Sequence, residues 1–379
     1  MPGGVIHMTT ADRFPPIDHQ WLDRSKKRFA SPFMGTRYDR ISVDPMMLSH
    51  ASVACGNTIG DFYRQPELGA HCVAYASQMY DLLPVTHWYF SLSWVAEMGL
   101  DIQYMETMPP VPEAPLISSP EEVDKVEVVS AEELAKGWTM QQYSKANDYI
   151  QKYLPDMFIP MVNVSDLTGS AAQLCGVDNF IMWTLSEPDA AHVLVDRYTQ
   201  TAINGAEAMS KKYGMAMIST GSVLANNDVF SDQMVADFSA KYLRKLVDGA
   251  FRKGAGPQVF YHLCGNHETD YKVIREHAMW SPFTIVNIGY QGREVFPADL
   301  MAKEFGHLAT IMPSVDTKLM IMPDAGRVYQ QAKEQIVRGR DSPHGFILGT
   351  ACEVPPYTPP ANINALVQAS KDFGTYGTW

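Results

Sequence analysis

Short apolar runs rich in β-forming residues recur along the chain, and stretches with helical periodicity separate most of them. A helix start signal, Ser186-Glu187-Pro188-Asp189, precedes the helical pattern of residues 190–213. Because alternating strands and helices form parallel sheets, this order predicts an α/β fold, a (βα)8 TIM barrel. The eight predicted strands are Val85–Phe90, Asp101–Met105, Met157–Val162, Met215–Thr220, Val259–Cys264, Phe283–Gly289, His307–Pro313 and Gly345–Ala351.

The pattern also predicts two parts of unequal size. Residues 1–82 precede the first predicted strand and are expected to form a helical N-terminal extension, with residues 60–80 as its clearest helix. Residues 83–379 are expected to form the catalytic barrel. The Pro-rich stretch 106–118 predicts a loop within it.

Three candidate metal ligands stand where predicted strands end. His262 and Cys264 close the fifth predicted strand, where residues two apart share a face, and Cys352 follows the eighth. Because all strands of such a barrel end at one mouth, the three side chains are expected to meet there. Three protein ligands would leave a fourth zinc position open, as in catalytic sites. His267 and Glu353 are candidates for that position.

The residues alone leave a second interpretation of this group open. A His-x-Cys pair is also compatible with a hydrogen-bonded core role, and a buried thiol at Cys352 can be inert. Several common catalytic motifs are absent: the sequence has no Gly-rich phosphate loop ending in Lys-Ser/Thr, no His-Glu-x-x-His and no Gly-x-Ser-x-Gly.

Composition narrows the class of protein. The chain has 379 residues, 46% of them hydrophobic, and a net charge of −12 without a basic run, which argues against nucleic acid as a partner. It offers no long apolar stretch and no leader pattern at residues 1–10, so no membrane association and a cytoplasmic location are expected. The five scattered cysteines predict reduced thiols, with Cys72 and Cys175 in the core.

Several segments between about Pro45 and Lys371 resemble the uroporphyrinogen decarboxylase superfamily, and within it the zinc- and corrinoid-dependent methyltransferases. The resemblance is distributed over residues 94–99 (WVAEMG) and the stretch 167–188. Its most specific parts are residues 262–266 (HLCGN) and 351–363 (ACEVPPYTPPANI). These last two segments carry the zinc ligands of the methyltransferase branch, matched here at His262, Cys264 and Cys352.

This resemblance implies an enzyme that moves a methyl group between a small substrate and the cobalt of a corrinoid. Asp341-Ser342-Pro343-His344-Gly345 has the wrong spacing for a corrinoid-binding signature, so the corrinoid is expected on a separate corrinoid-binding protein. The branch that decarboxylates a tetrapyrrole is an alternative. It is disfavoured because this chain reads Phe90-Ser91-Leu92-Ser93 where that branch has Phe-Ser-Asp.

The substrate is expected to be a small methylated compound or a thiol. A predicted mouth rich in Trp, Tyr and Met favours O-demethylation of an aryl methyl ether. Methylation of a thiol of the coenzyme M type from methylcorrinoid is the alternative. Asn266, Tyr290 and Gln291, which follow the fifth and sixth predicted strands, are the candidate substrate-binding residues.

Overall fold

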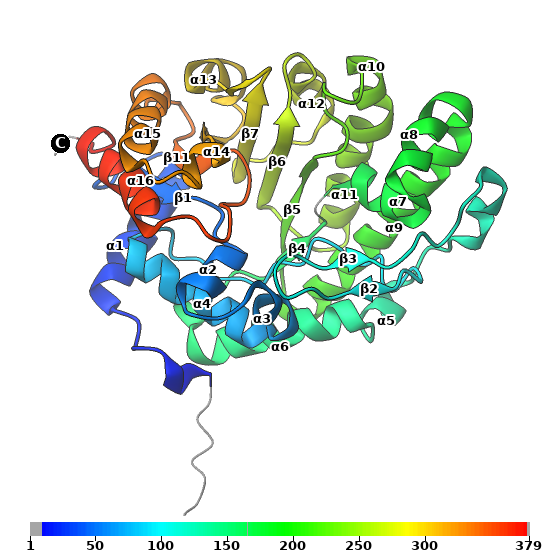
Figure 1. Ribbon diagram of the computed structural model, residues 1–379, viewed down its shortest axis with the longest axis horizontal. Helices are drawn as coiled ribbons and strands as arrows, with labels where there is room; N and C mark the ends of the chain where they lie inside the picture. The colour runs from blue at the N-terminus through cyan, green and yellow to red at the C-terminus, as the bar shows by residue number, and fades with distance from the viewer. Residues whose placement is uncertain (1–9, 165, 377–379) are drawn as a thin grey trace, which may run out of the picture.

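The computed structural model describes residues 10–164 and 166–376, so most of the N-terminal decapeptide used to argue against a leader lies outside them. The described chain forms a barrel of parallel strands with helices around it (Figure 1). The predicted TIM-barrel fold is therefore confirmed. No helix in this part of the chain is both long and apolar enough to cross a membrane.

Parallel pairing runs around the barrel. Strand β4 pairs with β5, β5 with β6, β6 with β7 and β7 with β9, while β11 pairs with β1. A bridge between Ile311 and Phe346 joins β9 to β11, and a bridge between Thr86 and Phe158 joins residues 83–86 to the chain before β4. The bounds are β1 Ser42–Asp44, β4 Met161–Asn163, β5 Met217–Ser222, β6 Val259–Asn266, β7 Thr284–Gln291, β9 Thr310–Met312 and β11 Ile347–Thr350.

One of the strand predictions is wrong, and one barrel strand was not predicted. Asp101–Met105 is not a barrel strand, because Ile102–Gln103 (β2) pairs in antiparallel fashion with Val111–Pro112 (β3) in a separate two-stranded sheet. The missing barrel strand is β1, which lies within the predicted helical extension and pairs with β11. The hydrogen bond from the Leu83 amide to the Val43 carbonyl, 3.3 Å, connects β1 to the next strand position. The proposed boundary at residue 82 stays a prediction.

Helices cover the outside of the barrel and part of its ends. Two short strands follow β7 and β9: β8 Glu294–Val295 pairs in antiparallel fashion with the end of β7, and β10 Ser314–Val315 pairs in parallel with β11. The helices are α1 His19–Ala30, α2 Ser49–Ala54, α3 Ile59–Arg64, α4 Pro66–Tyr80, α5 Ala131–Leu134, α6 Trp138–Tyr153, α7 Leu167–Cys175, α8 Val177–Ser186, α9 Pro188–Tyr213, α10 Asp232–Val235, α11 Lys241–Arg252, α12 Tyr271–His277, α13 Ala298–Phe305, α14 Thr317–Met320, α15 Ala325–Gly339 and α16 Pro360–Phe373.

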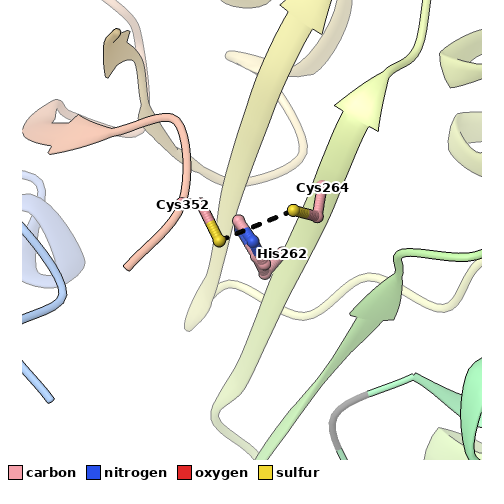
Figure 2. A group of neighbouring side chains, drawn as sticks. All are labelled: His262, Cys264 and Cys352. Carbon is pink, nitrogen blue, oxygen red and sulfur yellow. Dashed lines mark hydrogen bonds between the residues drawn. The ribbon is translucent and has the colours of Figure 1, made fainter. Parts of the chain in front are cut away.

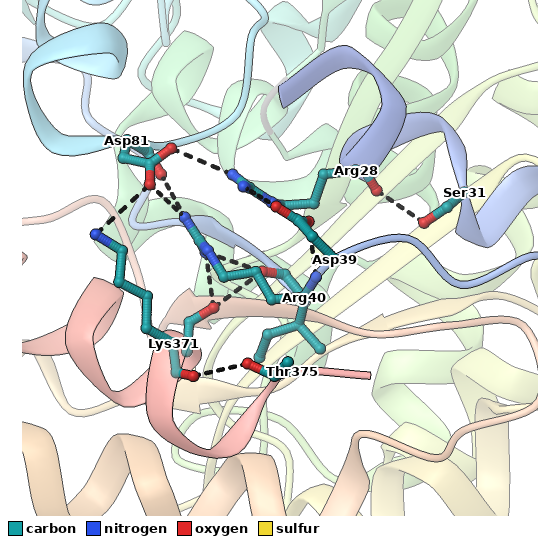
Figure 3. A network of polar contacts seen from close by, with 9 residues as sticks. Arg28, Ser31, Asp39, Arg40, Asp81, Lys371 and Thr375 are labelled. Atoms are coloured by element: carbon teal, nitrogen blue, oxygen red, sulfur yellow. Dashed lines mark hydrogen bonds and ion pairs between the residues drawn. The ribbon is translucent and has the colours of Figure 1, made fainter. Parts of the chain in front are cut away.

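An ionic network built on two buried arginines joins the N-terminal segment to the last helix (Figure 3). Two arginines, Arg28 and Arg40, are each about 5% exposed and share the carboxylate of Asp81 at 3.2 and 2.8 Å. Asp39 also accepts hydrogen bonds from Arg28, and Arg40 donates to Ser370 of α16 at 2.7 Å. Because buried guanidinium groups are costly without partners, this network fixes α1 and the chain before β1 against α16.

The buried His71 of α4 is expected to make the protein less stable at acidic pH. Its ring is 5% exposed, stacks on Phe14 and contacts the Tyr149 hydroxyl at 2.7 Å, and burial lowers its pKa to about 4. The unfolded chain, with a His pKa of about 6.5, binds more protons between these two values. The free energy of unfolding should therefore fall as pH drops through that window, by on the order of 3 kcal/mol from this group.

The measurement is urea unfolding between pH 7 and pH 4 for the protein, for His71→Gln and for His19→Gln, a change at an exposed residue. His71→Gln should show the shallower pH dependence, whatever its stability at neutral pH. Equal slopes in all three proteins would contradict the prediction.

Candidate functional site

Strand β6 presents alternate residues to the barrel interior. Val259, Tyr261 and Leu263 are buried against the outer helices, whereas Phe260, His262 and Cys264 keep some exposure because they line a cavity. This alternation follows from the two-residue period of a strand. A bulge at residues 263–266, with Gly265 at φ 89°, shifts the register directly after Cys264. The predicted shared face of His262 and Cys264 is present.

Cys352 approaches these residues from the loop after β11 (Figure 2). The Ala351 amide donates to the Val315 carbonyl at 2.9 Å, and the Thr350 hydroxyl contacts the Pro45 and Cys352 carbonyls at 2.8 and 2.7 Å. These contacts hold the start of the loop against β10 and β1. One ligand atom from each of His262, Cys264 and Cys352 lies within 4.8 Å of the other two.

The geometry of this group fits a zinc ion. The Cys264 and Cys352 sulfur atoms are 3.6 Å apart. Two thiolates on a tetrahedral zinc, with Zn–S bonds of about 2.3 Å, would be about 3.8 Å apart. The buried Nε2 atom of His262 has no partner other than the neighbouring Cys352 thiol, as expected of a nitrogen that would donate its lone pair to a metal.

Electrostatics also favour a cation here. The hydrogen bond from Cys264 lowers the pKa of the Cys352 thiol well below its usual value, although burial opposes this, and the nearby His262 lowers it further. Burial disfavours the charged form of His262, but its contacts with Cys352 outweigh that effect and raise the His262 pKa. A metal ion would replace the shared protons in such a group.

Asn287 of β7 fixes the orientation of His262, and the sequence analysis missed it. Its Nδ2 donates to the carbonyls of Met312 and Thr350 at 2.8 and 3.3 Å, so its Oδ1 faces the Nδ1 of His262 at 2.7 Å. That oxygen can only accept, so Nδ1 carries a proton and Nε2 is the atom left for a metal. A buried polar residue inside an otherwise apolar strand was the available signal.

Asn287→Ala should therefore weaken zinc binding by about 10- to 100-fold, because outer partners hold a ligating histidine in its binding tautomer. Competition with a chromophoric chelator measures the affinity. Asn147→Ala removes another buried asparagine, on α6, and serves as the control. Equal zinc affinity in Asn287→Ala and the unmodified protein would contradict the assigned role.

The two candidates for a fourth ligand lie outside this group in the described chain. His267 is fully buried and contacts Asp270 at 3.0 Å and the Cys264 carbonyl at 3.1 Å, so both of its ring nitrogens have partners. Glu353 lines the cavity and accepts a hydrogen bond from the Ser49 hydroxyl at 2.7 Å. Burial raises the Glu353 pKa to about 7. A zinc held by the three residues of the group would therefore keep a fourth position for a substrate atom.

A cavity of about 260 Å³ extends from the metal-ligand group into the barrel. Its wall is mostly apolar, with five methionines and the rings of Phe29, Tyr89 and Phe260, but the expected tryptophans are not part of it. Its ionisable residues are Asp44, His87, Tyr89, Glu353 and the three candidate ligands, and no lysine or arginine of the described chain lines it.

The three predicted substrate-binding residues lie near the mouth but do not line this cavity. Asn266 donates to Asp228 at 3.0 Å and accepts from the Gly292 amide. The Tyr290 hydroxyl donates to Asp316 at 2.8 Å, and Gln291 pairs with Glu294 in the turn between β7 and β8. Their part in substrate binding stays a prediction.

Comparisons with known proteins give a consistent result. A methylated-thiol–coenzyme M methyltransferase of Methanosarcina mazei is 25% identical over 290 residues, 75% of this chain and 71% of that protein. The methylcobamide:CoM methyltransferase MtaA of Methanosarcina barkeri is 24% identical over 208 residues, 54% of this chain and 55% of that protein.

The similarity to a solved structure and the family match agree with these two relatives. A solved methyltransferase from Methanosarcina mazei superposes with a TM-score of 0.75 at 20% identity, covering 92% of this chain and 99% of that one. The resemblance noted in the sequence, including its methyltransferase branch, is confirmed. Residues 24–373 match the uroporphyrinogen decarboxylase (URO-D) family, and the chain belongs to that family.

Proposed function

We propose that the protein is a zinc-dependent methyltransferase that moves a methyl group between a small substrate and a corrinoid carried by a partner protein. The observation that carries the proposal is the convergence of His262, Cys264 and Cys352 at the wall of an apolar cavity. The methyltransferases similar to this chain support it. A tetrapyrrole decarboxylase has no need of such a pair of cysteines beside a histidine.

His262, Cys264 and Cys352 would hold the zinc, with Asn287 orienting the histidine. When bound, zinc would supply a Lewis acid to the substrate heteroatom, lowering the pKa of a thiol or stabilising a departing phenolate or thiolate. The apolar wall excludes water from the reacting atoms, which strengthens these electrostatic interactions. Glu353, adjacent in sequence to Cys352 and held by Ser49, can carry a proton at its carboxylate.

The charge and polarity of the cavity wall favour some substrates over others. A sulfonated thiol of the coenzyme M type would bring a fixed negative charge to a wall on which the described residues place no lysine or arginine. A compact aryl methyl ether needs only apolar contacts and one polar group. We therefore propose aryl methyl ether O-demethylation as the reaction, with thiol methylation as the second candidate because relatives carry that activity in their names.

The mouth also suits the approach of a partner protein. Several large apolar side chains are exposed on loops that follow barrel strands, on the same side as the candidate metal centre. They include Ile321 at 55% and Met322 at 43% exposed after α14, and Tyr357 at 67% in the loop after β11. A corrinoid-binding protein would cover these residues when it presents its cofactor to the cavity.

The test uses the full chain, purified under reducing conditions, with its zinc content measured by elemental analysis. Methyl transfer from 2-methoxyphenol or dimethyl sulfide to free cob(I)alamin is followed by the change in corrinoid absorbance. One zinc per chain and zinc-dependent methylcobalamin formation are expected. A folded protein that binds no zinc, or that is equally active after zinc removal, would overturn the proposal.

A further inference from the structure

The wall opposite His262 and Cys264, beside the strand that leads to Cys352, carries a second polar site. Around the barrel the strand order is β1, residues 83–86, β4, β5, β6, β7, β9 and β11. In this ring β1 lies four positions from β6, so the last residue of β1, Asp44, and His262 of β6 stand on opposite walls. Both line the same cavity.

Asp44 has no charged partner in the described chain. Its Oδ1 accepts a hydrogen bond from the Met46 amide at 2.9 Å, and no lysine, arginine or histidine there lies within ion-pair distance. Burial raises its pKa, and the single hydrogen bond only partly offsets that effect. Glu353, the other acid on the wall, adjoins Cys352 in the sequence and has the proton-carrying role proposed above, so Asp44 is the acid left for the remote end of a ligand.

His87 lines the cavity from the chain segment next to β1. It belongs to the run from Val85 to Tyr89, in which every second residue lines the cavity. Burial lowers the pKa of His87 to about 4, so at neutral pH its ring is uncharged and offers one donor and one acceptor. The wall opposite His262 and Cys264 therefore combines a carboxyl group with a neutral imidazole, and no lysine or arginine among the described residues lines the cavity.

We propose that Asp44 and His87 form the subsite that binds the end of the substrate remote from its methyl group. The ligand class is a compact methylated ether or thioether, or the corresponding thiol, that carries a hydroxyl or amino group and no acid. A hydroxyl or ammonium donor satisfies the Asp44 carboxyl group, whereas a sulfonate or carboxylate would lose its hydration without gaining a cationic partner. This inference rests on the proposed function only in one respect, which is that the methylated or thiol end of the substrate lies at the metal-ligand group.

Three thiols of similar size test the subsite, because they differ at the end remote from sulfur. They are 2-aminoethanethiol, 2-mercaptoethanol and 2-mercaptoethanesulfonate, which carry a cation, a neutral hydroxyl and an anion. Isothermal titration calorimetry on the zinc-treated full chain gives the three affinities. We expect the amine and the alcohol to bind on the order of tenfold or more tightly than the sulfonate.

Asp44→Asn should reduce the preference for the amine over the sulfonate by about tenfold. The asparagine oxygen can still accept from the Met46 amide, so the β1 end should keep its conformation. Asp101→Asn makes the same charge change at an exposed position and should leave the order of affinities unchanged. Thermal unfolding of each variant confirms that it folds.

Two results would overturn the subsite: a sulfonate affinity equal to or above that of the alcohol, or an unchanged amine preference in Asp44→Asn. Zinc content, measured on the same samples, separates this outcome from failure of the proposed function. A protein without zinc that still ranks the three ligands as expected would retain the subsite and lose the zinc mechanism. A zinc-loaded protein that prefers the sulfonate would retain the zinc mechanism and lose the subsite.

Discussion

Alanine at Cys352 is expected to lower zinc affinity by at least about 100-fold and to abolish zinc-dependent methyl transfer. The sulfur of Cys352 lies 3.6 Å from that of Cys264, and a ring nitrogen of His262 lies within 4.8 Å of both. Two remaining ligands cannot complete a site that already leaves one position open. Cys264→Ala and His262→Ala should behave in the same way, since each removes one of the three donors.

The measurement pairs zinc content after dialysis against a zinc buffer with the methylcobalamin assay. Cys55→Ala removes a thiol that lies outside the cavity wall and should retain both zinc and activity. Far-ultraviolet circular dichroism shows whether each variant keeps the barrel. A folded Cys352→Ala protein with full zinc and full activity would remove the basis for the proposed function.

The candidate metal ligands could be predicted from the sequence because two simple geometric facts determine their positions. His262 and Cys264 are two residues apart in a strand, and Cys352 follows another strand of the same barrel. The strand count contained two errors that cancelled. Counting residues 101–105 and omitting Ser42–Asp44 left β6 as the fifth strand and β11 as the eighth.

The wall of the cavity that lies across from His262 and Cys264 could not be predicted in this way. Strand β1 has only three residues, too few for its alternation to stand out, so Asp44 gave no signal as a cavity residue. His87 lies in a predicted strand, but its inward direction depends on the barrel's closure between β1 and β4. Asn266, Tyr290 and Gln291 were chosen because they follow strands, whereas the cavity extends inward along the barrel.

The second large effect is expected at Gly221, which has no ligand role. Gly221 of β5 pairs with His262 of β6, and the two backbones approach closely at this point. A Cβ atom on residue 221 would lie 1.8 Å from the His262 carbonyl oxygen and 2.7 Å from its carbonyl carbon. Both atoms belong to the backbone, so no change of side-chain rotamer can relieve the overlap.

Gly221→Ala must therefore separate β5 from β6 at the residue that supplies the histidine ligand. We expect the free energy of unfolding of the metal-free protein to fall by more than about 3 kcal/mol, measured by urea denaturation, and zinc affinity to fall with it. Gly326→Ala, at an exposed helical position where the nearest atom is 3.4 Å away, is the matched control and should change stability little. If Gly221→Ala matched that control, β5 and β6 could not be as close at His262 as the structure places them. Such a result would also undermine the position assigned to the histidine, because the same backbone contact sets the height at which its ring enters the cavity.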